Sequence, residues 1–505
     1  MTSLTQRLSS LPPLAWLAAL IAALTIFRLA VLWTTPLNLG PDEAQYWSWS
    51  LTPAFGYFSK PPMIAWIIGL TTSMCGDGEA CIRVAAPLMH AITAFLIFLA
   101  GKALYDERIG LWSGVAYALM PGTSFSSLLI TTDVPLLMFW TLALWALAEL
   151  RKTPGTKWAI LFGAAIGLGL LSKYAMLYFV LGLGLALLPS PNGRSLLLSR
   201  AGAIAALAAL AVFAPNAIWN ALNSFATVGH TAANANWSWE KLFNIPNMLN
   251  FIGAQFGIAG PIAGGVFAWG LIRNWRDKKW DSADTLLLAL TLPIFAIVTL
   301  QAFISRANAN WAAPAFVALT ILFTAWAMRR SNTWAVKANA CLNAAIALLL
   351  GALAMSPAFV AAIGQENSVK RLRGWDEAGR TIMSVAASGP FDAIMSDDRE
   401  DMASLFYYMR DRKLPLRMWP SETARNQYEL THRLRDDETA NVLFVTRRSD
   451  VSEITNAFAS SSRIGTLETR LDPKRKRIFF LFALKGPVDT TLFPKFFDRP
   501  STDDH

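Results

Sequence analysis

Two adjacent carboxylates and a lysine stand in a short aromatic stretch near the start of the chain. Residues 38–62 read NLGPDEAQYWSWSLTPAFGYFSKPP, which places Asp42, Glu43 and Lys60 among tyrosines, tryptophans and phenylalanines. A carboxylate can remove the proton from an attacking hydroxyl, and a lysine cation can hold a phosphate and stabilise it as a leaving group. These residue types therefore predict acid–base chemistry beside an anion site.

Each of these residues also has a structural interpretation. The aromatic side chains suit an interfacial belt, where rings lie between lipid and water. The letters GPDEAQYW place Pro41 and two acids in a first helical turn, so Asp42 could mark a helix start. A helix start needs only one acid, whereas Glu43 adds a second. Together the stretch indicates a charged, amphipathic surface parallel to a membrane.

Three further charges, Asp133, Lys173 and Arg306, fall at predicted ends of apolar segments. Charges at membrane depth are costly, so such groups usually face a cavity or a partner. Alternatively, Asp133 caps the following helix with Pro135 in its first turn, and the two cations extend to the interface as anchors. Capping does not exclude a functional role.

The elements that must position these residues are membrane helices. The chain has 505 residues, of which 54% are hydrophobic and only 15% charged, which indicates a polytopic α-helical membrane protein. We expect about eleven spans, at most thirteen: 14–33, 84–104, 110–129, 134–150, 157–172, 174–189, 201–220, 248–271, 284–304, 311–328 and 338–362. The first segment lacks a small-residue cleavage site and is expected to be retained. Residues 62–73 are too short to span and are expected to lie in the interface.

Charge in the loops predicts the orientation, because short cytoplasmic loops retain Lys and Arg. With the N-terminus inside, 15 cations fall on the cytoplasmic side: Arg7, Lys102, Arg108, Arg151, Lys152, Lys157, Arg194, Arg200, Arg273, Arg276, Lys278, Lys279, Arg329, Arg330 and Lys337. Five fall outside: Lys60, Arg83, Lys173, Lys241 and Arg306. The net charge of +10 therefore reports membrane orientation and not nucleic-acid binding.

An odd number of spans divides the chain into a membrane domain, 1–362, and an exported domain, 363–505. In the latter, FDAIMSD, NVLFVT and RIFFLFAL predict strands, and REDMASLFYYMRDR and ETARNQYELTHRLR predict helices. Asp472-Pro473 predicts a hairpin between the last two strands. We expect a small α/β domain, located in the periplasm if the cell is a Gram-negative bacterium.

Two of the three cysteines, Cys75 and Cys81, fall in one exported loop. An oxidising compartment would permit a disulfide between them, and two free thiols are the alternative.

A lipid phosphate would explain the charges near the exported ends of the helices. A polyprenyl-phosphate sugar has its tail in the bilayer and its phosphate at the interface, where cations would hold it. A nearby carboxylate could then activate an acceptor hydroxyl that attacks the anomeric carbon.

The segments PDEAQYWSWS, GYFSKPPMIAW, RVAAPLMHAITAFLIFLAGKALY, TTDVPLLMFWTLAL and GLGLGLLSKYAMLYFV resemble the bacterial branch of the protein mannosyltransferase superfamily, over residues 1 to about 330. The resemblance implies a GT-C fold and inverting transfer from a polyprenyl-phosphate sugar. It implies Asp42 as catalytic base with Glu43 beside it. It further implies that Lys60, Lys173 and Arg306 bind the donor phosphate, and that Asp133, Tyr57 and Tyr46 position the sugar or the site.

One departure separates the chain from the aminoarabinose transferases of that branch, which have an acid before the KPP lysine where Ser59 stands here. It argues against a metal site built on that acid, and His230, the only histidine in a predicted exported loop of the membrane domain, is expected to be structural. We therefore expect no metal and no cofactor. The motifs are similar to those of galacturonic acid transferases, in which Arg306 could pair with the uronic carboxylate.

We thus expect an inner-membrane glycosyltransferase acting as a monomer among membrane lipids. It would move a sugar to lipid A or lipopolysaccharide, and the similarity to galacturonic acid transferases implies that this sugar is galacturonic acid. The alternatives are a transporter or flippase of lipid-linked sugars and a protein O-glycosyltransferase. A transporter favours mid-membrane charges and paired halves, which the sequence does not show.

Overall fold

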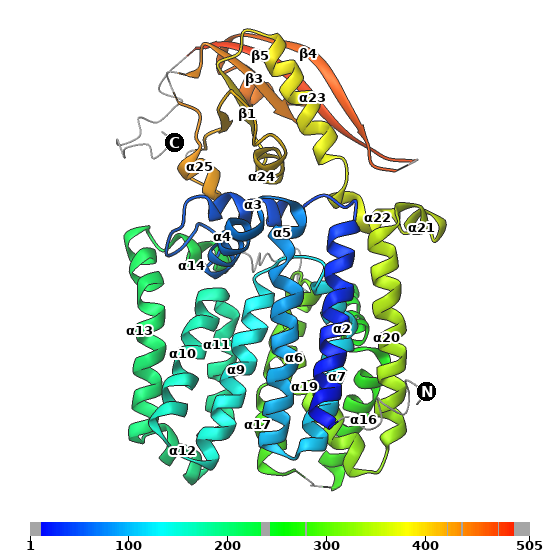
Figure 1. Ribbon diagram of the computed structural model, residues 1–505. Coiled ribbons are helices and arrows are strands. Elements are labelled where there is room, and N and C mark those ends of the chain that lie inside the picture. The colour runs from blue at the N-terminus through cyan, green and yellow to red at the C-terminus, as the bar shows by residue number, and fades with distance from the viewer. Residues whose placement is uncertain are drawn as a thin grey trace. The chain divides into compact units, whose positions relative to one another are not determined.

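The computed structural model describes residues 12–233, 243–277, 280–421, 423–435, 438–472 and 474–488 (Figure 1). Arg7, Lys241, Lys278, Lys279 and Pro473, which entered the predictions above, lie outside the described residues. The chain divides into two compact units. The first comprises residues 1–36 and 53–356, and the second comprises residues 37–52 and 357–505.

The first unit is built of helices that follow the apolar runs of the sequence. Those in its first half are α2 (Pro13–Thr34), α4 (Met63–Cys75), α5 (Glu79–Arg83), α6 (Ala85–Leu104), α7 (Glu107–Leu119), α8 (Pro121–Ser126), α9 (Asp133–Lys152), α10 (Thr156–Ser172), η1 (Tyr174–Met176) and α11 (Leu177–Leu187). Those in its second half are α12 (Pro191–Leu197), α13 (Arg200–Leu222), α14 (Ala226–Ala233), α15 (Ile245–Ala259), α16 (Pro261–Asp277), α17 (Ser282–Ala289), α18 (Leu292–Ile304), η3 (Ala309–Ala312), α19 (Ala315–Arg329) and α20 (Thr333–Met355). Helix α10 packs between α9 and α13, and α6 packs on α7 and α9.

Among the described residues, six helices are long and apolar enough to cross a membrane, or seven if one bent pair counts as a span. Several of the eleven expected segments correspond to shorter helices, and the number of spans stays a prediction. The expected span 248–271 is not one helix, because α15 and α16 meet at an angle of 112°. Gly260 lies between them with φ +86°, and a Cβ there would lie 2.5 Å from the side chain of Asn343.

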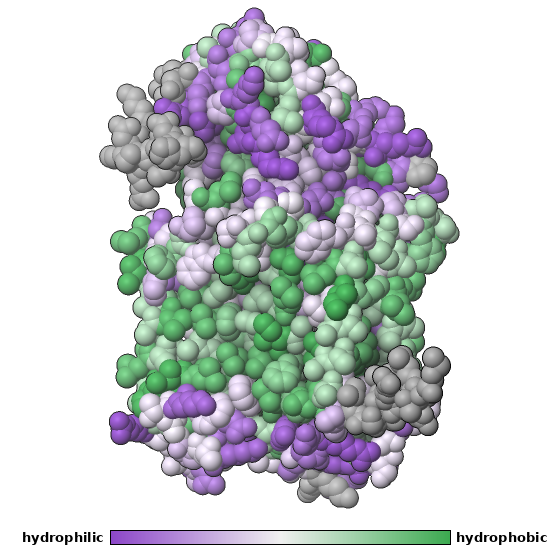
Figure 2. Space-filling view, viewed as in Figure 1, coloured by the Kyte–Doolittle hydropathy of each residue, from purple (hydrophilic) through white to green (hydrophobic). Residues whose placement is uncertain are grey.

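Apolar side chains cover the visible face of these helices in a broad band, which Figure 2 shows in green. In the same unit, the side chains of Ile26, Leu207 and Leu210 are each more than 60% exposed. Hydrophilic residues gather at the end of the unit where α12 and α17 lie (Figures 1 and 2). A large exposed apolar surface with a polar margin is what a lipid-embedded unit requires.

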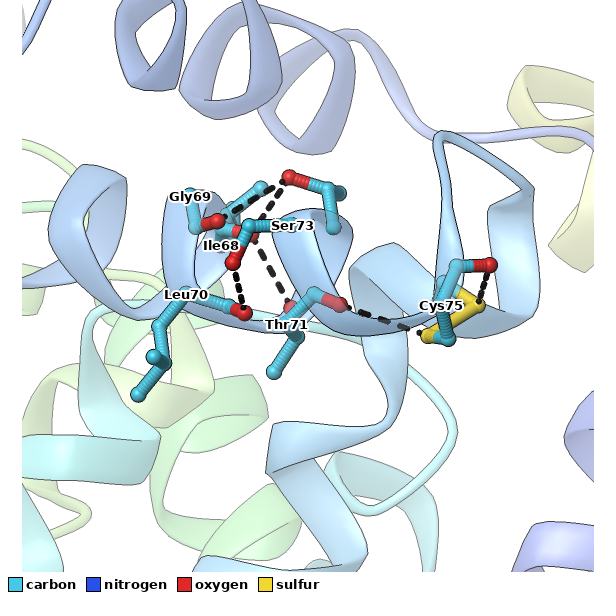
Figure 3. The surroundings of a disulfide bond; sticks show 8 residues. Ile68, Gly69, Leu70, Thr71, Ser73 and Cys75 are labelled. Atoms are coloured by element: carbon cyan, nitrogen blue, oxygen red, sulfur yellow. Dashed lines mark hydrogen bonds between the residues drawn. A yellow bond between two sulfur atoms is a disulfide. The ribbon is translucent and has the colours of Figure 1, made fainter.

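The short helix α4 ends at a disulfide. Cys75 and Cys81 are joined, so the bond, and not the pair of free thiols, is found (Figure 3). Within α4, the hydroxyls of Thr71, Thr72 and Ser73 return to backbone carbonyls one turn earlier. This lets a helix of 13 residues keep polar side chains without external partners.

The second unit contains a five-stranded sheet of order β2-β1-β3-β5-β4. Its strands are β1 (Ala393–Ser396), β2 (Leu416–Met418), β3 (Asn441–Thr446), β4 (Phe458–Arg470) and β5 (Lys476–Pro487). Strand β1 pairs in parallel with β2 and β3, whereas β5 pairs antiparallel with β3 and β4. The helices after residue 357 are α21 (Pro357–Ala362), α22 (Glu366–Val369), η4 (Lys370–Leu372), α23 (Trp375–Ser388), α24 (Arg399–Tyr408), α25 (Gln427–Thr431) and α26 (Ser452–Thr455).

The three predicted strands are present, and NVLFVT coincides with β3. The predicted helix 399–412 is present as α24, but the predicted helix 422–435 is reduced to the five residues of α25. Asp472 lies in the turn between β4 and β5, where its carboxylate accepts the N–H groups of Lys474 and Arg475. Such an Asx turn satisfies backbone donors that leave the ladder.

Helix α3 (Pro41–Ser50) belongs to the second unit, although it precedes most of the membrane helices in sequence. The ring of Trp47 packs edge-on against Tyr407 of α24 at a centroid distance of 4.9 Å. The Ser48 hydroxyl lies 2.9 Å from the Tyr428 hydroxyl. The expected membrane domain 1–362 includes residues 37–52, which the structure groups with residues 357–505, and the boundary at 362 stays a prediction.

The buried carboxylate of Asp401 in α24 gives the second unit a pH-dependent stability. Burial raises the pKa of Asp401 to about 7, although Arg447, whose Nε lies 2.7 Å from Oδ1, acts in the opposite direction. The folded pKa exceeds the unfolded value of about 4, so the folded state binds more protons. The contribution of Asp401 to the free energy of unfolding is therefore at its maximum below about pH 4, and it is lost as the pH rises through about 7.

We expect the amide-exchange protection of α24 in the full-length protein, corrected for intrinsic exchange, to fall between about pH 4.5 and about pH 7.5. In Asp401→Asn the protection of α24 should no longer depend on pH in this range, because the group that takes up the proton is gone. A slope of equal size in both proteins would assign the pH dependence to another group.

Candidate functional site

The two predicted catalytic acids lie in the first turn of α3 and do different things. Gly40 is the N-cap, Pro41 follows it, and Glu43 Oε2 accepts the Gly40 N–H at 2.8 Å. Glu43 is 4% exposed, whereas the side chain of Asp42 is 62% exposed. The helix start is therefore served by Glu43, and the carboxylate of Asp42 is left at the surface of the unit.

Asp42 has a cationic partner that sequence reasoning missed. Nη1 of Arg399, the first residue of α24, donates to Asp42 Oδ1 at 3.0 Å. The same nitrogen donates to Gln45 Oε1, one turn further along α3. No spacing rule connects residue 42 with residue 399, so no signal in the sequence could have revealed the pair.

Tyr46, also on α3, is 5% exposed, and its ring lies 5.4 Å from that of Trp49. This contact places the Tyr46 ring against a neighbour on its own helix. A role in positioning a sugar stays a prediction.

In the first unit, the loop that carries Lys60 is held by hydrogen bonds to its backbone. Tyr57 donates its N–H to the carbonyl of Lys60 at 3.1 Å, and its hydroxyl accepts the N–H of Ala54 at 3.1 Å. The Thr227 hydroxyl donates to the Tyr57 carbonyl at 2.6 Å. Tyr57 is 2% exposed, and burial raises its pKa to about 12. Tyr57 therefore fixes the conformation of the loop, and Lys60 is half-buried within it.

A second set of contacts anchors the same loop to α13. Asn216 Nδ2 donates to the Phe55 carbonyl at 2.6 Å, and the Tyr174 hydroxyl donates to Asn216 Oδ1 at 2.9 Å. A Cβ at Gly56 would lie 2.3 Å from the ring of Trp219. Only glycine permits this approach of the loop to the helix, which explains the glycine of the GYFSKPP motif.

The structure brings Asp133 and Lys173 together. Lys173 Nζ lies 2.7 Å from Asp133 Oδ1, with the side chains 20% and 8% exposed. Asn310, which follows Arg306 in the letters NANW, donates to Asp133 Oδ2 at 2.7 Å and was not predicted. Asp133 makes no capping bond, since Thr132 is the N-cap of α9. The capping and anchoring alternatives therefore do not describe this pair.

Arg306 is not part of that cluster. Its side chain is exposed and makes no ion pair with the residues that the structure describes, while its carbonyl accepts from Gln301 at 3.2 Å. His230 packs its ring against Phe58 at 5.6 Å. Within the described ranges, no three His, Cys, Asp or Glu side chains are grouped so that they could hold a metal ion.

The comparisons with known proteins agree on one family. Residues 59–219 match the family described as dolichyl-phosphate-mannose-protein mannosyltransferase. Lipid A galacturonosyltransferase RgtD of Rhizobium johnstonii is 34% identical over 429 residues, which are 85% of this chain and 90% of that protein. An undecaprenyl phosphate-alpha-4-amino-4-deoxy-L-arabinose arabinosyl transferase of Pseudomonas fluorescens is 26% identical over 55% of this chain and 54% of its own length.

Among solved structures, ArnT from Cupriavidus metallidurans bound to undecaprenyl phosphate matches with a TM-score of 0.64 at 16% identity. The match covers 93% of this chain and 98% of that one, so the two share a fold. Since a relative 34% identical also spans most of both chains, this chain belongs to the dolichyl-phosphate-mannose-protein mannosyltransferase family and is a membrane glycosyltransferase of the GT-C fold.

Proposed function

We propose that the protein transfers a sugar, galacturonic acid, from a polyprenyl-phosphate donor to a lipid A or lipopolysaccharide-type acceptor. The observation that carries this proposal is the 34% identity to a lipid A galacturonosyltransferase over 85% of the chain. The similarity to a transferase named for an undecaprenyl phosphate-linked sugar supports the donor class.

The reaction needs one base and one group that stabilises the leaving phosphate. An acceptor hydroxyl attacks the anomeric carbon, the new carbon–oxygen bond forms as the bond to the phosphate oxygen breaks, and the configuration inverts. The hydroxyl proton passes to the Asp42 carboxylate, and the leaving polyprenyl phosphate carries the bonding electron pair. Lys60 stabilises the charge that develops on that phosphate.

The remaining residues have supporting roles in this proposal. The paired Asp133 and Lys173 provide a buried polar site, in which Lys173 assists phosphate binding and Asp133 orients the lysine. The exposed guanidinium of Arg306 pairs with the uronic carboxylate, a contact that would be bidentate. A catalytic role for Glu43 stays a prediction, because one of its oxygens serves the helix start.

The cellular location is inferred from the charges of the loops and from the disulfide. We propose that the protein lies in the inner membrane with its second unit in the periplasm, where an acceptor lipid can be reached. The cations of the predicted cytoplasmic loops and the disulfide in a predicted exported loop support this orientation.

The test is transfer by the purified full-length protein, with polyprenyl-phosphate galacturonic acid, aminoarabinose and mannose offered in separate reactions with lipid A. Mass spectrometry should show lipid A gaining one uronic acid residue. Lipid A that gains another sugar would overturn the choice of sugar. Sugar found attached to protein would favour the protein O-glycosyltransferase. Movement of the donor across the membrane without transfer of its sugar would favour the flippase.

The same assay tests Lys60. Lys60→Met is expected to raise the KM for the donor roughly 10- to 100-fold, the effect of losing a charge-assisted contact to phosphate. Lys102→Met is the matched control, since Lys102 is half-exposed and pairs with Glu107 at 3.3 Å. Equal KM values for both variants would remove Lys60 from the phosphate site.

A further inference from the structure

The contact between α3 and α24 gives the DE motif a partner from the far end of the chain. Arg399 lies at the first position of α24, directly after Asp398, whose carboxylate caps the helix by accepting the N–H groups of Glu400 and Asp401. The cap fixes the backbone from which the Arg399 side chain extends. Its guanidinium reaches two acceptors on α3, Asp42 Oδ1 and Gln45 Oε1.

The two acceptors are three residues apart, so they lie on the same face of α3. A guanidinium is planar and presents its donors in a rigid arrangement, which transmits orientation to whatever it binds. Gln45 is 2% exposed and cannot move freely, so it holds the guanidinium in place. The carboxylate of Asp42 is thereby restrained through a buried neighbour, although Asp42 itself is exposed.

Neighbouring carboxylates keep the guanidinium of Arg399 protonated. Burial alone lowers the pKa of Arg399, but the carboxylates of Asp42 and Glu400 outweigh it, and the pKa is raised. Only Oδ1 of Asp42 is engaged by Arg399, and Oδ2 accepts no hydrogen bond from the residues that the structure describes. One oxygen is therefore held while the other is available to take a proton.

From this geometry we infer that Arg399 is a positioning residue for transfer, which orients the Asp42 carboxylate toward the acceptor hydroxyl. The inference rests on the proposed role of Asp42 as the base. It makes the second unit, to which both Asp42 and Arg399 belong, a contributor to the chemistry. Arg399 acts through Asp42 and need not touch the donor.

The experiment measures kcat and KM of full-length Arg399→Gln, Arg399→Lys and Arg399→Ala with donor and lipid A. Arg399→Gln should lower kcat roughly 10- to 100-fold, the effect of a misplaced reacting group, and leave both KM values within about twofold. Arg399→Lys or guanidinium added to Arg399→Ala should restore part of kcat. Arg371→Gln is the control, because Arg371 also pairs with Glu400 but forms no ion pair or hydrogen bond with Asp42 among the residues that the structure describes.

Amide exchange of α3 and α24 shows whether each variant is folded. The inference is overturned if Arg399→Gln keeps kcat within about twofold of the unmodified protein. It is also overturned if protection is lost and neither lysine nor guanidinium restores turnover, which would indicate a structural role alone. Failure of the proposed function is recognised separately, as normal activity in Asp42→Asn or as no use of polyprenyl-phosphate sugars.

Discussion

Replacing Asp42 with asparagine is expected to lower kcat for transfer to a hydroxyl acceptor roughly 10²- to 10⁴-fold, the contribution of a general base. Asparagine keeps the size of the side chain and an oxygen for Arg399, but it cannot take up the proton. The Asp42–Arg399 pair is exposed on the Asp42 side, so its loss should change stability by no more than about 1 kcal/mol. Turnover with the purified variant and its thermal unfolding provide both quantities.

Asp376→Asn is the matched control for this result. Asp376 is a half-exposed acid of the same unit that pairs with Arg380 on its own helix at 3.1 Å, and its removal should leave kcat unchanged. If the acceptor group were an ionised phosphate, no base would be required and Asp42→Asn would keep most activity. That outcome would contradict both the role of Asp42 and a hydroxyl acceptor.

Breaking the Asp133–Lys173 pair is expected to cost about 3–5 kcal/mol for either single replacement, because the remaining charge is left buried without its partner. Lys173→Gln leaves Asp133 with Asn310 alone, and Asp133→Asn leaves Lys173 without a carboxylate. The double variant should lose less than the sum of the two, since it leaves no unpaired charge. Thermal unfolding of the four proteins in detergent measures this cycle.

An exposed ion pair, Arg273 with Asp277, serves as the control for the loss of stability expected at the buried pair. Arg273 lies 3.4 Å from Asp277 on the same helix, with the arginine side chain 57% exposed, so Arg273→Gln should cost less than about 1 kcal/mol. Additive losses at Asp133 and Lys173, each as small as this control, would show that the pair is solvated and does not form a buried polar site.

The elements that sequence analysis predicted are those with a local signal. The apolar run of α2 and the β-branched run of β3 appear where expected, since continuous hydrophobicity implies burial. The Asp472-Pro473 turn implied a strand before it, but the residues of β4 could not be named, because most of its 13 residues are exposed and polar, as suits an edge strand. The break at Gly260-Pro261 carried a turn signal, but the surrounding apolar letters resembled one span.

In the candidate site too, some residues had a local signal in the sequence and others did not. Asp42, Lys60, Asp133 and Lys173 could be named as candidates because ionisable groups beside apolar segments are conspicuous in a sequence. Their partners could not, because Arg399 is hundreds of residues from Asp42 in the chain. Asn310 is neutral and gave no comparable signal. Long-range pairing of this kind depends on the packed fold, which no local pattern encodes.

The assignment of α3 to the second unit limits how these enzymes can be recombined. Trp47 and Ser48 are fitted to Tyr407 and Tyr428, so the helix and the α/β unit form one packing module encoded by two distant stretches of the gene. A chimaera that exchanges only residues after 357 between two relatives would join mismatched surfaces. Residues 37–52 must be exchanged with them, and substitutions on the two stretches should occur in correlated pairs during divergence.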